Sequence, residues 1–475
     1  MTRIEKDYLG ELSVPEDAYY GIHTVRALQN FPVSQCKVPR EFIQALAEVK
    51  LACTRANVRT NLLDPKRGEA IIEAAQEVVS GRFYDQFVVD AFQGGAGTST
   101  NMNMNEVLAN RAIEFLGGIK GEYHIVDPLE HVNLSQSTND VYPTALKVAA
   151  IRLVITLSEA IAQLQGAFQQ KESAFAGILK LGRTEMQDAV PITLGQEFGA
   201  FAEAVARDRW RLFKVEERLR QVNLGGTATG TGLNAEREYI YVAVEELQRI
   251  TGLGIARAEN MVDVTQNADV YVEVSGLVKA AAVNLAKIAG DLRLLSAGPR
   301  GGLAEICLPQ LQAGSSIMPN KVNPVMTEMV SQVSFQVISS DQAITLAVLS
   351  GQLELNAFLP LVTFNLLMVL KLLINCVTIF RTHCVEGISA NPERCTKWLE
   401  ESLCLATALA PYIGPDKAAE LSRQAAAHGK TIRQMALEEG LFTPDELETI
   451  FSPQELTRPG IAGFRKLKNR LKGNN

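Results

Sequence analysis

Four long stretches of this chain repeat apolar residues at spacings of three and four, which is the period of one helix face. They run from Glu41 to Asn57, from Tyr142 to about Ala176, from Leu194 to Val222 and from Asp269 to about Ala297. The third lasts for roughly eight turns without a proline. Because helices of this length pack as a bundle and strand-like alternation is scarce, we expect a mostly helical fold in which any sheet is small.

Two changes in composition suggest three domains. We predict a mixed, mainly helical N-terminal domain over residues 1–139, a central domain of long helices over 140–395, and a small helical C-terminal domain over 396–475. The second boundary lies next to the more charged segment NPERCTKWLEES. Neither boundary carries a linker of low complexity, so both are approximate.

Composition and charge narrow the class of protein. With 475 residues, 47% hydrophobic and 21% charged, the chain has the composition of a soluble globular protein, and a net charge of -7 without a long basic run argues against nucleic-acid binding. The start, MTRIEKDYLG, lacks the apolar core of a signal peptide, and the seven cysteines form no CxxC pair. We therefore expect a cytoplasmic protein with reduced thiols. Its five histidines show no metal-ligand spacing.

The segment Ala357–Phe380 is apolar and long enough to cross a bilayer. Asn365, Lys371 and Asn375 interrupt it, and Pro360 lies near its start. A helix that is apolar on nearly all sides with a few polar breaks is typical of the centre of a helical bundle. We therefore predict a core helix and no membrane partner.

Polar segments rich in Gly, Ser, Thr and Asn separate the predicted helices. These residues form turns and cap helices, but the segments are longer than the roughly 4 to 6 residues that a connection needs. Long loops on a rigid frame often carry function. They are predicted at Gln93–Glu106, His131–Thr144, Leu181–Pro191, Asn223–Asn234 and Gly314–Pro324.

Together these loops offer donors suited to a small anion, and backbone N–H groups at helix starts would add to them. A dicarboxylate is one candidate ligand, with one carboxylate held by Lys321 and Asn323, and phosphate is equally compatible. No GxxxxGK[ST] motif favours phosphate, and GTATGTG lacks the GxGxxG order of a dinucleotide site. The side chains are the hydroxyls of Thr98, Ser99, Thr100, Ser135, Ser137, Thr138, Thr184, Ser315 and Ser316, the amides of Asn139 and Asn323, and Lys321.

The loop GSSIMPNKVNP resembles the signature of the aspartase/fumarase superfamily, lyases that add or remove ammonia, water or an amine across a carbon–carbon bond. The likeness extends in order through GGAGTSTNMNMNEVLANRA, HVNLSQSTND, GRTEMQDAVPITLGQEF, NLGGTATGTGLN and LRLLSAGPRGGL. Arg3–Ala27 and Pro459–Gly463 are similar to the aspartate ammonia-lyase branch more than to the fumarase branch. The resemblance implies three mostly helical domains, with five long central helices contributing to a twenty-helix core in a homotetramer. It also implies active sites shared between three subunits.

The same resemblance implies roles for individual residues. Ser315 is expected to lose its proton and act as the base, producing an enediolate-like carboxylate. A free serine is a very weak acid, so Lys321 and backbone N–H groups around Gly314–Ile317 are expected to stabilise the charged form. The carboxylate that accumulates charge is expected to contact Thr98, Ser137, Thr138 and Ser316. The other carboxylate is expected to contact Thr184, Lys321 and Asn323. Asn139 is expected near the leaving ammonium.

Glu185 departs from the family pattern, because many relatives carry histidine or glutamine there. A carboxylate would repel a dicarboxylate with a hydroxyl leaving group but attract a substrate ammonium, so Glu185 favours an amine leaving group. The alternative is that Glu185 turns away and pairs with Arg183 or caps a local helix. Smaller departures are Asn320 and Leu359, and His131 is either a supporting group of the site or a structural histidine.

The expected function is the reversible anti elimination of ammonia from a small-molecule amino acid, L-aspartate, to give fumarate. No organic cofactor is expected, and an activating divalent cation, as in some relatives, is left open because no ligand set is visible. The alternatives are an ergothionase-like or other amine lyase of the same fold, a fumarate hydratase, and a catalytically inactive structural homologue. Intact Ser315, Lys321 and Asn323 argue against the last.

Overall fold

The computed structural model describes residues 1–471 and is mostly helical, as predicted. Contacts between residues divide the chain into two compact units, which are described one at a time. The first contains Met1–Glu159, Asp208–Val283 and Val333–Asn375, and the second contains Ala160–Arg207, Asn284–Gln332 and the chain from Cys376 onward. The predicted three-domain division remains a prediction.

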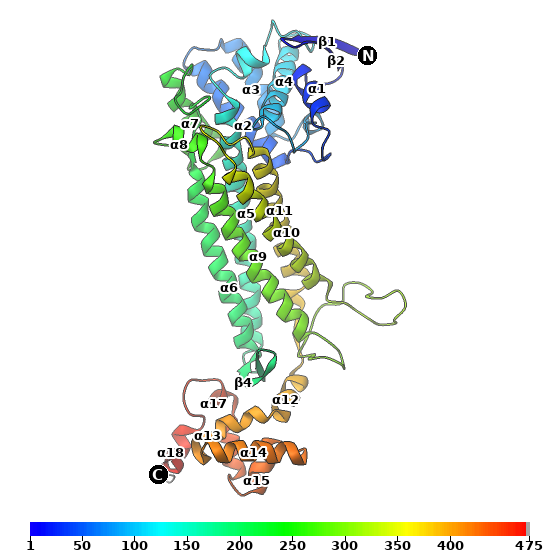
Figure 1. The fold of residues 1–475 in the computed structure, drawn as a ribbon, viewed down its shortest axis with the longest axis vertical. Helices are drawn as coiled ribbons and strands as arrows, with labels where there is room; N and C mark the ends of the chain where they lie inside the picture. Colours follow the sequence, from blue (N-terminus) through cyan, green and yellow to red (C-terminus); the bar gives the residue numbers. More distant parts are fainter. Residues whose placement is uncertain (472–475) are drawn as a thin grey trace. The chain divides into compact units, whose positions relative to one another are not determined.

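Long helices make up much of both units (Figure 1). They are α5 (Thr138–Ala174), α6 (Leu194–Val215), α9 (Asp269–Leu295), α10 (Val325–Leu349) and α11 (Leu359–His383). With α2 (Arg40–Arg59), the helices α5 and α9 confirm three of the four helices expected from the apolar period, and α6 confirms most of the fourth, whereas α10 was not predicted.

One helix is shorter than its periodicity predicts. The apolar pattern continues to Val222, but α6 ends at Val215 and is followed by a 3-10 turn, Glu216–Arg220. The next two residues form strand β5 (Gln221–Val222), which pairs in parallel with β6 (Ala256–Arg257). The prediction of a helix to Val222 was therefore wrong, because pairing with a strand distant in sequence determines this backbone.

Helix α11 contains the apolar segment that could by length cross a membrane. It is the one helix in the described residues that is long and apolar enough, and 56% of its most apolar window is buried inside the structure. Two of its polar residues have partners, since Asn365 donates to the Leu361 carbonyl at 3.0 Å and Lys371 pairs with Glu41 at 2.7 Å. These features are those of a helix packed in protein.

In the first unit, α2 packs against α3 (Pro65–Val79) and α7 (Arg237–Thr251), and α3 packs against α4 (Thr98–Phe115) (Figure 1). Helix α2 is buried along most of its length, and Phe42 packs on Tyr142 with ring centroids 4.5 Å apart. A short helix, α8 (Met261–Gln266), follows β6. This core holds the starts of α4 and α5, where several predicted site residues lie.

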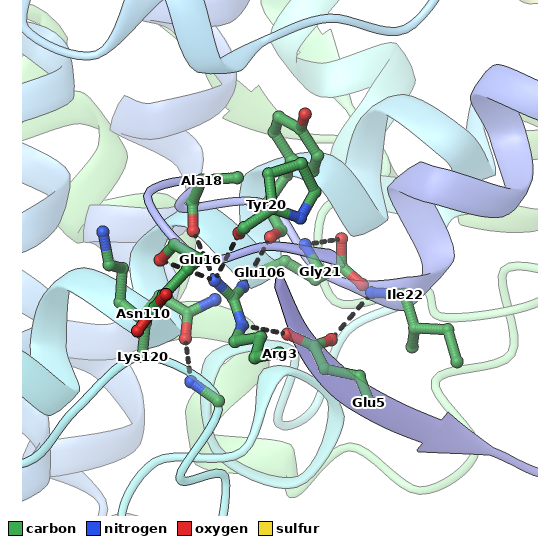
Figure 2. A network of polar contacts seen from close by, with 12 residues as sticks. Arg3, Glu5, Glu16, Ala18, Tyr20, Gly21, Ile22, Glu106, Asn110 and Lys120 are labelled. Atoms are coloured by element: carbon green, nitrogen blue, oxygen red, sulfur yellow. Dashed lines mark hydrogen bonds and ion pairs between the residues drawn. The ribbon is translucent and has the colours of Figure 1, made fainter. Parts of the chain in front are cut away.

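The N-terminal hairpin, β1 (Thr2–Asp7) and β2 (Gly10–Pro15), precedes α1 (Ile22–Asn30), whose first turn is bound by two buried carboxylates (Figure 2). Glu106 accepts from the Gly21 N–H at 2.8 Å, and Glu5 accepts from the Ile22 N–H at 2.8 Å. Arg3 in turn donates to Glu5 at 2.7 Å. Carboxylates satisfy the free N–H groups of a helix start and complement its dipole, so they link the hairpin to α1.

In the second unit, the segment predicted as the loop Leu181–Pro191 is an antiparallel hairpin of β3 (Leu179–Thr184) and β4 (Gln187–Thr193). Strand β7 (Ile306–Cys307) pairs with β8 (Ser389–Ala390). Each sheet among the described residues has two strands, which confirms that sheet structure is small.

Short helices complete the second unit around a core that includes Leu409, Tyr412, Leu421 and Ile432. Thr431 and Thr443 form capping boxes with Gln434 and Glu446, which defines where two of them begin. The helices are α12 (Pro392–Glu401), α13 (Ala406–Ile413), α14 (Pro415–His428), α15 (Ile432–Glu438), α16 (Pro444–Ile450), α17 (Pro453–Leu456) and α18 (Phe464–Leu471).

Candidate active site

In the first unit, Thr98 is the first residue of α4, so the predicted loop Gln93–Glu106 is helical from that point onward. Gly97 precedes it with a φ of +97°, and the Tyr142 ring occupies the place that a side chain at residue 97 would need. Glycine therefore allows both the backbone turn and the close approach of α5. The Thr98 hydroxyl donates to the Gly95 carbonyl at 2.7 Å, so here it serves the turn.

Ser137, Thr138 and Asn139 surround the start of α5. The Ser137 hydroxyl oxygen accepts from the Asn139 N–H at 3.2 Å, and the Ser137 N–H donates to the Asp140 carboxylate at 3.0 Å. Thr138 Oγ1 accepts from Asn101 Nδ2 at 3.2 Å, and because Asn101 lies in the first turn of α4, the two helix starts are neighbours. The structure therefore brings Thr98, Ser137, Thr138 and Asn139 into one region of the first unit.

Asp140 joins this region to the Gly-rich segment Asn223–Asn234, a connection that the sequence analysis missed. Its Oδ2 accepts from the N–H groups of Gly225 at 3.1 Å and Thr227 at 3.0 Å. Asn139 Nδ2 also donates to the Ala228 carbonyl, at 2.7 Å. Burial raises the pKa of Asp140 to about 6, while the backbone N–H bonds act in the opposite direction. Asp140 follows the predicted Asn139 directly, and the acid at this helix start was the available signal.

In the second unit, the loop Gly314–Pro324 is closed by its own backbone and one side chain. The Gly314 N–H donates to the Lys321 carbonyl at 2.7 Å, and Asn323 Nδ2 donates to the Gly314 carbonyl at 2.9 Å. A side chain at residue 314 would lie 2.7 Å from the Lys321 oxygen, so glycine is required there. In this structure Asn323 supports the loop through one N–H of its side-chain amide.

The Ser315 side-chain oxygen lies inside a small set of backbone donors. It accepts from the N–H of Met318 at 2.9 Å and from the N–H of Ile317 at 3.2 Å. Of the N–H groups expected around Gly314–Ile317, that of Ile317 is directed at this oxygen, and that of Gly314 bonds instead to the Lys321 carbonyl. Met318, just outside the expected range, supplies the second donor. Two N–H groups directed at one oxygen favour negative charge on it, although the same geometry also stabilises an ordinary serine turn.

Three other residues of this loop help to define it. Asn320 has a φ of +60°, a region that asparagine tolerates better than most residues with a side chain. Ser316 and Lys321 are exposed, and the Lys321 ammonium has no carboxylate partner within the described residues. Lys321 is therefore a cation free to bind an anionic ligand.

Thr184 and Glu185 lie at the β3–β4 hairpin turn. Glu185 and Met186 have φ values of +52° and +64°, as in a two-residue type I′ turn, and both predicted contacts are exposed. Arg183 pairs with Glu305 at 2.8 Å, and no helix begins at this turn. The structure therefore supports neither of the two structural roles considered for Glu185.

His131 and the question of a metal complete the description. His131 Nδ1 accepts from the Asp127 N–H at 2.7 Å, which is a structural role in the short turn before α5. Within residues 1–471, no group of three or more His, Cys, Asp or Glu side chains is placed to hold a metal ion. The predicted donors thus form one group in the first unit, and a loop and a hairpin turn in the second.

Known lyases are similar to this chain over nearly its whole length. Residues 10–339 match the lyase family model, and residues 405–458 match the model of the fumarase C C-terminus. An aspartate ammonia-lyase of a Bacillus species is 48% identical over 97% of this chain and 98% of its own length, and that of Escherichia coli K12 is 46% identical over 98% of both.

Two solved structures are similar over nearly the whole chain. The fumarate lyase:delta crystallin from Brucella melitensis bound to cobalt has a TM-score of 0.94 and 48% identity, and covers 97% of this chain and 100% of its own. A recombinant class II fumarase from Schistosoma mansoni has a TM-score of 0.92 and 33% identity, with the same coverage.

Proposed function

This chain belongs to the lyase family, and we propose that it is an aspartate ammonia-lyase that converts L-aspartate reversibly into fumarate and ammonia. Identity of 44 to 48% with aspartate ammonia-lyases over nearly the full length supports this activity. The structural observation that carries it is the Ser315 oxygen held by two backbone N–H groups. The same loop carries Lys321, whose exposed ammonium has no carboxylate partner in the described part of the chain.

The proposed reaction begins at Ser315. Its deprotonated oxygen takes a proton from the carbon next to a substrate carboxylate, and the electron pair moves into that carboxylate to give an enediolate. Ser137, Thr138 and Ser316 donate to this carboxylate, and Thr98 joins them by exchanging its bond to the Gly95 carbonyl for one to the substrate. Thr184, Lys321 and Asn323 hold the other carboxylate. One well-placed donor to a developing charge contributes roughly 3 kcal/mol, so several together matter.

The second step breaks the carbon–nitrogen bond. The electron pair returns to form the carbon–carbon double bond, neutral ammonia leaves, and the proton on Ser315 is released afterward. We propose that Glu185 attracts the substrate ammonium, with Asn139 nearby. The exposed position of Glu185 at a turn, without an ion pair to Arg183, supports this role.

We propose that the active form is a homotetramer whose active sites are shared between three subunits. Apolar side chains are exposed on two long helices, at Trp210 and Phe213 of α6 and at Phe335, Leu346 and Leu349 of α10, with exposed fractions between 54% and 67%. Large apolar side chains exposed together along long helices support an interface there. The three on α10 are spaced to share one helix face.

No organic cofactor is needed in this proposal, because the base and the donors are side chains of the protein. A divalent cation would act as an activator, not as a reactant. We also propose a cytoplasmic location. All seven cysteines are free, and two of them, Cys36 and Cys307, are exposed. Exposed free thiols are typical of a reducing compartment, which supports this location.

Three alternatives have different support. An ergothionase-like lyase that releases trimethylamine is compatible with Glu185, because the carboxylate would attract the trimethylammonium group of that substrate through charge alone. A fumarate hydratase is disfavoured because Glu185 would repel a dicarboxylate without an ammonium. An inactive structural homologue is disfavoured by the ordered donors around Ser315.

The test is fumarate absorbance when purified protein is offered aspartate, malate or a trimethylated amino acid separately. We expect fumarate from aspartate, and a Ser315→Ala variant should lose roughly a hundredfold or more of the rate because it lacks the base. Fumarate from malate alone would identify a hydratase, and unimpaired Ser315→Ala activity would exclude Ser315 as the base.

A further inference from the structure

Under the start of α5, one buried lysine holds the oxygens of two amide side chains. Lys50, on α2, is fully buried and donates to Asn133 Oδ1 at 2.9 Å and to Gln136 Oε1 at 2.8 Å. The same Asn133 oxygen also accepts from Asn101 Nδ2 at 3.2 Å and Asn105 Nδ2 at 3.1 Å. Three donors therefore converge on one side-chain oxygen.

This arrangement determines which way each amide points. An ammonium has only donors, so Asn133 must present its oxygen to Lys50. The side-chain nitrogen of Asn101, and not its side-chain oxygen, must therefore face the Asn133 oxygen, since two carbonyl oxygens would repel each other. The second hydrogen of Asn101 Nδ2 is then directed at Thr138 Oγ1, 3.2 Å away.

The consequence reaches Thr138. Its hydroxyl oxygen accepts from Asn101, so its single proton is left to donate elsewhere. A hydroxyl with its proton directed outward is a donor for a carboxylate, whereas one that donated to Asn101 would repel it. Lys50 thus sets the direction of each hydrogen bond in the chain from Asn133 through Asn101 to Thr138, which is a predicted substrate contact.

We propose that Lys50, Asn133 and Asn101 form a buried relay that makes the Thr138 hydroxyl a donor to the carboxylate of the substrate. This inference rests on the proposed function, because it assumes that Thr138 binds a dicarboxylate. Lys50, Asn133 and Asn101 are positioning residues, since they act through Thr138.

The positive charge of Lys50 also contributes to the relay. Burial lowers the pKa of Lys50 to about 7. The titratable groups that face it are Cys53 on its own helix and Asp140 at the start of α5. Burial raises the pKa of Cys53 to about 12, so that thiol is neutral near pH 7 and the Asp140 carboxylate is the group that favours the protonated form of Lys50. A carboxylate bound at Thr138 would add to the effect of Asp140. Binding of a dicarboxylate slightly above neutral pH should therefore draw a proton onto Lys50.

The first test is a double-mutant cycle read by calorimetry with succinate, an unreactive dicarboxylate without an ammonium. Thr138→Val should weaken succinate binding about tenfold or more, the effect of one hydrogen bond to a charged group. Asn101→Ala should weaken binding several-fold in the unchanged protein but have no further effect beside Thr138→Val. Equal weakening in both backgrounds would show a general structural role and overturn the relay.

The second test uses Lys50→Met and a matched control. Lys147 is also buried and donates to a backbone carbonyl, that of Gln221, at 2.6 Å, but it bonds to no predicted substrate contact. Lys50→Met should weaken succinate binding and raise the KM for aspartate, and should abolish proton uptake on succinate binding near pH 7.5. Lys147→Met should leave succinate affinity unchanged. Unaltered proton uptake in Lys50→Met, or equal loss of affinity in both variants, would contradict the proposal.

These measurements also separate this inference from the proposed function. Each variant is first compared with the unchanged protein by thermal unfolding. If Lys50→Met does not fold, the succinate affinity of Asn101→Ala is the measurement that decides. Succinate binding with the expected cycle but no fumarate from aspartate would support the relay and refute the lyase activity. If aspartate gives fumarate but Asn101→Ala leaves succinate binding unchanged, the lyase activity is supported and the relay is refuted.

Discussion

Glu185 stands at a turn position that directs its side chain into solvent, away from its own strand. Its neighbour Arg183 is already paired with Glu305, so the Glu185 carboxylate is available to a ligand. A Glu185→Gln variant keeps the shape and removes the charge that would attract a substrate ammonium. We expect kcat/KM for aspartate to fall about tenfold, measured by fumarate absorbance.

The control for this prediction is the exposed Glu400 of α12, changed to glutamine. It should leave kcat/KM within error of the unchanged protein. Identical kinetics for aspartate in Glu185→Gln would remove the argument that Glu185 selects an amine leaving group.

Glu106 gives a prediction about pH. Burial raises the pKa of Glu106 from 4.5 to about 7, while its bonds to Thr24 and to backbone N–H groups act in the opposite direction. Between these values the folded protein binds a proton more readily than the unfolded chain, so this group makes the fold less stable as pH rises through the window. The full difference corresponds to about 3 kcal/mol.

A Glu106→Gln variant cannot titrate, so it should lack this pH dependence. Its thermal midpoint, compared with that of the unchanged protein at the same pH, should rise by several degrees between pH 5 and pH 8. A difference in midpoint that stays constant over this range would show that Glu106 keeps an ordinary pKa.

At the scale of elements, the β3–β4 hairpin is anchored by buried ion pairs. Glu305 is fully buried and pairs with Arg183 at 2.8 Å and with Lys180 at 3.0 Å, and Lys180 also pairs with Glu197 at 2.8 Å. The hairpin that carries Thr184 and Glu185 is thus tied to the segment that leads to the Ser315 loop.

Removing one partner of a buried ion-pair network leaves the others uncompensated, which costs about 3–5 kcal/mol. Glu305→Gln should therefore lower the thermal midpoint clearly, while Glu400→Gln, a matched change at an exposed site, should leave it nearly unchanged. A midpoint for Glu305→Gln equal to that of the control would mean that the hairpin is held by packing alone.

At the scale of the whole molecule, the exposed apolar faces of α6 and α10 predict an assembly. We expect a tetramer in solution, measured by light scattering after size exclusion. Replacing Phe335 and Leu349 together with serine should dissociate it and lower activity more than a hundredfold, because shared sites would be broken. A monomer of full activity would contradict both the tetramer and the shared sites.

A control for that experiment is a pair of serine substitutions at exposed apolar residues distant from these helices in sequence. Tyr8 and Leu9, in the turn of the N-terminal hairpin, are exposed and are suited to it. This double variant should keep both the mass and the activity of the unchanged protein.

Much of this protein was predictable from sequence because the signals are local. Apolar period identified α2, α5, α9 and most of α6 but not α10. The Gly-, Ser- and Asn-rich motifs identified the family and the segments that carry the predicted site residues. Asn320 illustrates the limit: it was only an unusual residue in the motif until the structure showed a positive φ, which depends on how the loop closes.

The sequence by itself determined the helical architecture, the family and the chemical types of the site residues. Tertiary structure decided where α6 ends, that Arg183 pairs with Glu305 rather than Glu185, and that Lys50 lies beneath Asn133. The physical reason is that helix period and turn chemistry depend on neighbours in the chain. Strand pairing, buried ion pairs and the direction of a hydrogen bond depend on groups that only folding brings together.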